Sequence, residues 1–178
     1  MKGNMRRRTS ERVALTALGT ALICIATRVF QIPIPLGYAH LGNCVILLFA
    51  VYFDPVTGGL SAALGSALAD LLSFPVWALP TLLIKGVMGA VCAVIAKKRG
   101  EQGRIRSVRA LLACLAAIGI MVSGYFLAGS FLYGSFAAGA AQIPGLALEG
   151  VVGIGLFYAL AAALEAAGTF RRHHGMLL

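Results

Sequence analysis

Long apolar runs separated by short polar segments make up most of the sequence. An α-helix needs about 20 apolar residues to cross the hydrocarbon core of a bilayer, and most of the runs reach that length. The second run is shorter, because its eleven residues rise only about 17 Å; it is either buried in the protein or tilted together with its flanks. We predict an all-α integral membrane protein with six transmembrane helices in a single domain, residues 1–178. The predicted spans are 11–30, 43–53, 55–72, 77–96, 110–132 and 144–167.

Prolines and small residues punctuate this pattern. Pro33 and Pro35 exclude a continuous helix after the first span and favour an extended segment there. In the third span, four residues recur at every fourth position and form one stripe: Gly58, Ala62, Ser66 and Asp70. Such a stripe lets another helix approach closely, as small residues do in membrane helix pairs.

The charged residues support a membrane location and indicate an orientation. Only 12% of the residues are charged, against about 25% in soluble domains. Thirteen of the 15 basic residues lie in segments 2–12, 97–109 and 171–172, each beside an apolar run. Under the positive-inside rule, both termini and segment 97–109 are therefore expected in the cytoplasm. The outward connectors 31–42, 73–76 and 133–138 contain no Lys or Arg.

Several functions are excluded or disfavoured by motifs. The formal charge of +9 comes without the interleaved aromatic residues that bind single-stranded nucleic acid, so we expect no nucleic-acid partner. The four cysteines lie within apolar runs without a CxxC pair, which predicts neither a disulfide nor a metal site. No hydrolase or dinucleotide motif is present, and no lysine follows a glycine as in a P-loop. We expect no enzymatic activity and no cofactor, and any ATP-driven work requires a partner.

Three ionisable residues within the spans are candidates for function: Asp70, Lys85 and Glu149. Each such residue costs about 2.5–3.5 kcal/mol on membrane-insertion scales. With the predicted orientation, Asp70 lies near the outer end of its span, and the helical rise places Lys85 roughly 12 Å and Glu149 roughly 8–15 Å below the outer surface. Tyr125 falls at a similar depth. These positions predict a polar pocket in the outer half of the membrane, covered by the proline-rich connector.

Structural roles remain open for the same residues. Asp70 and Lys85 can form an ion pair that joins the third and fourth spans, and Glu149 can be a protonated acid bonded to backbone. Trp77 and Tyr38 are either interfacial belt residues or ligand contacts. The remaining candidate is His40, a single histidine in the connector.

The order of several segments resembles a known family. An Ala17-xxx-Ala21 pair is followed by IPIPLGYAHLGN, GGLSAALGSALADLL and LPTLLIKGVMG. Together these resemble the substrate-binding S components of energy-coupling factor (ECF) vitamin transporters, in the riboflavin-transporter-like branch, over residues 12–95. The resemblance implies a six-helix subunit of the bacterial plasma membrane that binds a vitamin or precursor beneath the first extracellular loop.

The resemblance also implies partners. An S component joins a membrane-embedded T component and two cytoplasmic ATPases, and topples to release its substrate inward. The small-residue pair, here Ala17 and Ala21, would contact the T component; the alternative is packing within the chain. Members of the family often read HLGD where this chain has HLGN. Because Asn43 replaces that aspartate, we infer no relative's substrate for this chain.

We therefore predict one outward-facing site for a small heterocycle, lined by Asn43, Asp70, Lys85, Tyr125 and Glu149. Asn43 would donate and accept, Glu149 would accept, Tyr125 would stack, and Lys85 would meet a ligand oxygen while Asp70 holds it. One alternative is a stand-alone proton-coupled transporter or channel, although the inverted repeats typical of that class are not visible. Another is an intramembrane enzyme that uses His40, Asp70 and Glu149 as acid–base groups.

Overall fold

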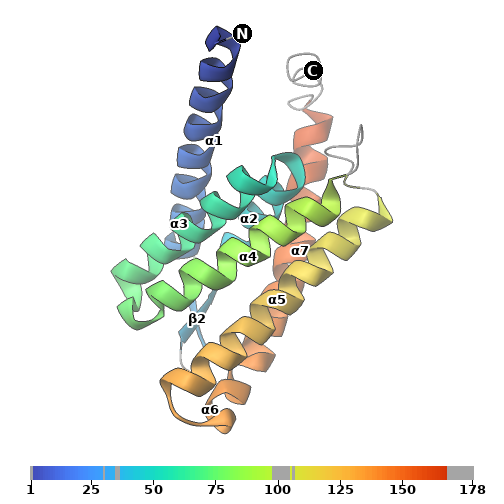
Figure 1. The fold of residues 1–178 in the computed structure, drawn as a ribbon. Coiled ribbons are helices and arrows are strands. Elements are labelled where there is room, and N and C mark those ends of the chain that lie inside the picture. Colours follow the sequence, from blue (N-terminus) through green and yellow to red (C-terminus); the bar gives the residue numbers. More distant parts are fainter. Residues whose placement is uncertain (1, 30, 35–36, 98–104, 106, 168–178) are drawn as a thin grey trace.

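The computed structural model describes residues 2–29, 31–34, 37–97, 105 and 107–167, with the backbone alone for 2–8, 32, 34 and 37–39. Its elements form a bundle of tilted helices with one short hairpin (Figure 1). In chain order they are α1 (Lys2–Val29), β1 (Gln31–Ile34), β2 (Gly37–His40), α2 (Gly42–Tyr52), α3 (Pro55–Ser73), the 3-10 turn η1 (Pro75–Trp77), α4 (Ala78–Ala96), α5 (Val108–Leu132), α6 (Phe136–Ala141) and α7 (Ile143–Ala166).

Five segments of the described chain are long and apolar enough to cross a membrane: Thr9–Val29, Pro55–Ser73, Pro75–Ala96, Val108–Leu132 and Phe136–Ala166. The remaining apolar run is α2, which has only 11 residues and is buried along nearly its whole length. Of the two readings of this short run, the structure supports burial within the protein. A count of six crossings stays a prediction.

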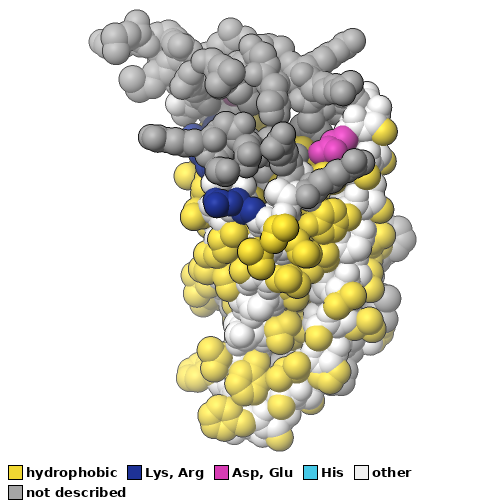
Figure 2. Space-filling model, turned by 90° about the vertical axis from the view of Figure 1, so that its right-hand side faces the viewer, with side chains coloured by type: hydrophobic (Ala, Val, Ile, Leu, Met, Phe, Trp, Pro, Cys, Tyr) yellow, Lys and Arg dark blue, Asp and Glu magenta, His cyan; other side chains and the backbone are white. Residues whose placement is uncertain are grey.

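The surface is apolar where lipid would touch it. On the face shown in Figure 2, hydrophobic side chains cover most of the described surface, and the charged side chains lie toward the end where α1 begins. Large side chains such as Phe131, 87% exposed, point outward from α5. In water such a surface would drive aggregation, whereas hydrocarbon solvates it.

One end of the bundle holds the beginning of α1, the end of α4, the beginning of α5 and the end of α7 (Figure 1). The hairpin, α6 and the turn between α3 and α4 lie at the other. This shared end carries Arg12, Lys97 and Arg109, which is the distribution that the positive-inside rule requires of a cytoplasmic edge. Its placement in the cytoplasm stays a prediction.

The proline-rich connector departs from an all-α fold. Residues 31–34 and 37–40 form an antiparallel hairpin in which Gln31 pairs with His40 and Ile34 with Gly37. An extended connector was expected from its prolines, and Pro33 lies in β1; the pairing of its two halves was not foreseen. The segment after α5 also differs, because residues 136–141 form the short helix α6 instead of a simple connector.

Glycines set the spacing of the central helices. A β-carbon at Gly89 on α4 would lie 2.7 Å from the carbonyl oxygen of Gly58 and 2.9 Å from the β-carbon of Ala62, both on α3. The first half of the small-residue stripe on α3 therefore faces α4. A β-carbon at Gly153 on α7 would lie 2.9 Å from that of Asn43, so glycine there lets α7 approach the start of α2.

Candidate binding site

A chain of buried polar groups joins three helices in the interior. Lys85 on α4 donates from Nζ to Oδ1 of Asn43 on α2 at 2.6 Å, and Asn43 donates from Nδ2 to Oε1 of Glu149 on α7 at 2.7 Å. The three residues are 1%, 0% and 6% exposed, respectively. Buried charges persist only when they are paired and hydrogen-bonded. The Asn43 amide, which both accepts and donates, makes that pairing possible between a cation and an acid.

Met121 on α5 completes the polar chain, and it was not among the residues predicted from the sequence. Its sulfur lies 3.2 Å from Nδ2 of Asn43 and 3.1 Å from Nζ of Lys85. A thioether is a weak acceptor that adapts to irregular gaps. Met121 stands four residues before Tyr125, on the same helix face, and that spacing is the signal that could have found it.

Aromatic side chains form a wall beside the ammonium group. Nζ of Lys85 lies 5.5 Å from the ring centroid of Tyr125, within the range of a cation–π contact. The Tyr125 hydroxyl shares a hydrogen bond of 2.8 Å with Oγ1 of Thr81, one helical turn before Lys85. The rings of Trp77 and Tyr125 are 5.6 Å apart, and Trp77 is also 6.2 Å from Tyr133. Trp77 is only 5% exposed, so it is a wall residue rather than an interfacial belt residue.

His40 reaches the cluster from the hairpin. Its Nδ1 accepts a hydrogen bond from the Gly42 backbone N–H at 3.1 Å and lies 3.6 Å from Oε1 of Glu149. Burial, assisted by the positive charge of Lys85, lowers the pKa of His40 well below its usual range. The lowered pKa favours the neutral imidazole beside Glu149. The hairpin thus ends directly on the polar chain.

Asp70 belongs to the same electrostatic environment. Its side chain is buried near the end of α3, within electrostatic range of Lys85 and Glu149. The structure thus brings together seven of the residues named from the sequence: His40, Asn43, Asp70, Trp77, Lys85, Tyr125 and Glu149. For Tyr38 it describes only the backbone, which pairs with Pro33 across the hairpin. Within the described residues, no group of His, Cys, Asp and Glu has the arrangement of a metal site.

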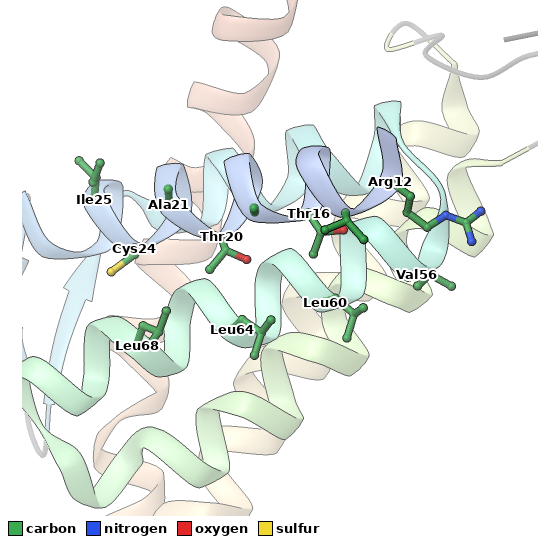
Figure 3. A pocket seen from close by; sticks show the side chains of 12 residues that line it. Arg12, Thr16, Thr20, Ala21, Cys24, Ile25, Val56, Leu60, Leu64 and Leu68 are labelled. Atoms are coloured by element: carbon green, nitrogen blue, oxygen red, sulfur yellow. The ribbon is translucent and has the colours of Figure 1, made fainter. Parts of the chain in front are cut away.

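A second feature lies on the outside of the bundle. An open apolar groove of about 670 Å³ runs between α1 and α3 (Figure 3). The exposed Ala17 and Ala21 line one side, and leucines of α3 that are nearly half exposed line the other: Leu60, Leu64 and Leu68. Most of its lining is apolar, with Arg12, Thr16 and Thr20 as the polar residues, and the groove shares no residue with the polar chain. Its shape and chemistry suit a helix or a lipid chain, not a polar solute.

The apolar helices define a multi-pass membrane protein, and within the described residues a buried polar chain lies beside the hairpin. Residues 7–166 match the family model described as "ECF-type riboflavin transporter, S component". The chain therefore belongs to that family, and it is a substrate-binding subunit of an ECF transporter.

Other comparisons find a similar fold and further similar sequences. A solved structure described as the S component of a bacterial ECF transporter superposes with a TM-score of 0.71, at 20% identity, over 89% of this chain and 97% of that one. Among curated proteins, an uncharacterized protein in the gap 3′ region of Pyrococcus woesei is 40% identical over 105 residues, which is 58% of this chain and 68% of that protein. A UPF0397 protein of Streptococcus agalactiae serotype Ia is 32% identical over 102 residues. That match spans 55% of each chain, about half the length of the relative.

Proposed function

We propose that this subunit captures a small vitamin or cofactor precursor, a heterocycle of the B-vitamin type, from outside the cell for ATP-driven uptake. The observation that carries the proposal is the buried Lys85–Asn43–Glu149 chain beside the aromatic wall of Trp77 and Tyr125. Small-molecule sites combine an apolar or aromatic cleft with a few placed polar groups that fix orientation. The family description supports a flavin as the first ligand to test.

In this proposal the polar groups exchange partners when the ligand enters. Lys85 turns from Asn43 to a ligand oxygen, and Asn43 and Glu149 receive the N–H groups of the heterocycle. The ring lies against Tyr125 or Trp77. Because each lost internal hydrogen bond is replaced by one to the ligand, the charged groups are never left buried and unpaired. The hairpin, which ends at His40, closes the site.

The partners follow from the subunit class. No lysine in the sequence follows a glycine as in a P-loop, so the energy for uptake comes from partners. For a subunit of this class, these are a membrane-embedded T component and two cytoplasmic ATPases. Ala17 and Ala21 are exposed and line the groove between α1 and α3, which supports a helix of the T component as their contact. Small residues on such a face permit close helix approach. The family match gives no support to a stand-alone proton-coupled transporter or channel, or to an intramembrane enzyme.

The test is a binding measurement on the purified protein. Small molecules released on denaturation are identified by mass spectrometry, and the ligand-free protein is titrated with riboflavin and with a panel of other B vitamins. We expect saturable binding of one heterocycle. If no heterocycle is retained and none in the panel binds, the proposal is wrong.

A further inference from the structure

Gln142 carries a buried amide donor that the polar chain does not use. The residue links α6 to α7 and is 3% exposed. Its backbone is satisfied, because its N–H donates to the Gly139 carbonyl and its carbonyl accepts from the Leu146 N–H. Its side-chain Nε2, in contrast, has no hydrogen-bond partner among the residues that the structure describes.

The amide lies against the aromatic wall. A β-carbon at Gly129 on α5 would collide with Nε2 of Gln142 and would stand 3.4 Å from Cη2 of Trp77. Glycine at this position therefore opens the notch that the amide occupies, beside the edge of the Trp77 ring. Gly129 itself follows Tyr125 by one helical turn. The unused donor therefore lies beside the aromatic wall.

Gln142 also shares a helix face with Glu149. The two residues are seven positions apart, and Gln142 keeps helical backbone angles where α7 begins. Seven residues make close to two turns, so both side chains project on one side about 10 Å apart along the axis. Glu149 belongs to the polar chain at one end of this span, and Gln142 stands at the other end beside Trp77.

Few buried donors in folded proteins remain unpaired, and each requires an explanation. Among the described residues, three other buried side-chain atoms also lack a hydrogen-bond partner: Oγ1 of Thr20, Oγ1 of Thr27 and Oγ of Ser66. Those are hydroxyls on α1 and α3, and a hydroxyl can both donate and accept. The Gln142 amide nitrogen can only donate, and it lies beside Trp77 of the aromatic wall.

We infer that Gln142 is the second polar anchor of the binding site. Its Nε2 donates to a carbonyl oxygen or ring nitrogen at the end of a planar heterocycle, while the opposite end meets Lys85, Asn43 and Glu149. The ligand class is therefore an elongated planar heterocycle with a hydrogen-bond acceptor at its far edge. This inference rests on the proposed function and adds a residue and a ligand shape to it.

The experiment compares two variants with the wild type, using riboflavin as the probe. Gln142→Met keeps the length of the side chain and removes the donor, and Gln142→Glu replaces the donor with an acceptor. Ser130→Ala is the matched control, because Ser130 follows Gly129 but its hydroxyl donates to the Phe126 carbonyl within α5. For each protein, the melting temperature without ligand and the dissociation constant for riboflavin are measured.

We expect Gln142→Met to keep or raise the ligand-free melting temperature, because it removes a buried unpaired donor, and to weaken riboflavin binding by about 5- to 150-fold. Gln142→Glu should also weaken it, and Ser130→Ala should bind normally. Any of three results would overturn the role of Gln142 as an anchor while the proposed function stands. These are unchanged affinity in Gln142→Met, tighter binding in Gln142→Glu, and a lower ligand-free melting temperature in Gln142→Met. Failure of both variants to fold overturns it too. Failure of the wild type to bind any heterocycle overturns the function and the anchor together.

Discussion

Lys85 does not reach Glu149 directly but through Asn43, whose amide accepts from the ammonium at 2.6 Å and donates to the carboxyl at 2.7 Å. An ionised aspartate at this position would accept from Lys85 but have nothing to donate to Glu149. The Asn43 amide links Lys85 of α4 and Glu149 of α7 into one hydrogen-bonded unit, so a substitution of either residue should alter the hydrogen bonding of the other.

The first prediction concerns this unit. Lys85→Met and Glu149→Gln should each weaken riboflavin binding by about 5- to 150-fold, since each removes one buried polar partner of the ligand. Titration of the purified variants measures the effect. Tyr52→Phe is the control, because its hydrogen bond to Glu165 joins α2 and α7 outside this cluster. Unchanged affinity in both site variants would leave the buried charges with a structural role only.

Stability of the same variants gives a second, independent prediction. Removing one member of a buried charged pair leaves the other uncompensated and typically costs about 3–5 kcal/mol. Lys85→Met should therefore unfold at a lower temperature than the double variant with Glu149→Gln, in which both charges are gone. A double-mutant cycle of thermal unfolding in detergent measures the coupling. Additive effects would mean that the two residues do not act as a unit.

The sequence was sufficient for the membrane class and for most residues of the buried polar cluster, for a physical reason. Inserting a charged residue into a membrane costs so much free energy that Lys85 and Glu149 are recognised as functional candidates from the sequence. The helical rise then places them at similar depth. Hydropathy carries no comparable signal for Met121 or Gln142, because a thioether looks like core and an uncharged amide looks like a helix end. Their roles depend on which side chains meet across α5 and α7. The hairpin escaped prediction likewise, since its pairing depends on contacts across a turn and not on composition.

Acid should weaken the contact between α1 and the start of α3. Asp54 caps α3 through the backbone N–H groups of Val56 and Thr57, accepts from the Thr57 hydroxyl at 2.7 Å, and lies 3.4 Å from Arg12. Burial alone would raise the pKa of Asp54, but these hydrogen bonds and Arg12 outweigh it and lower the pKa below its usual 3.8. Because the folded state then holds the proton less tightly than the unfolded state, the stabilisation is present above about pH 4 and is lost as the pH falls further.

Thermal unfolding between pH 7 and pH 3 tests this sign. Asp54→Asn retains a good helix cap but cannot ionise, so its melting temperature should depend less on pH than that of the wild type. Asp54→Ala should lose about 0.5–2 kcal/mol at pH 7, because the cap is removed as well. Equal pH dependence in the wild type and Asp54→Asn would assign acid sensitivity to other carboxyl groups.

The final prediction concerns the groove between α1 and α3. Ala17 and Ala21 are exposed on one of its sides, which argues against a role in packing within the chain and favours contact with a partner helix. The double change Ala17→Trp with Ala21→Trp should abolish transport and co-purification with the T component while leaving riboflavin affinity unchanged, because bulky side chains destroy a small-residue seam. Leu18→Trp with Leu22→Trp is the matched control, since both leucines are exposed on α1 outside the groove. Equal loss in both pairs would show that any bulk on α1 is harmful, and normal transport by the alanine variant would place the contact elsewhere.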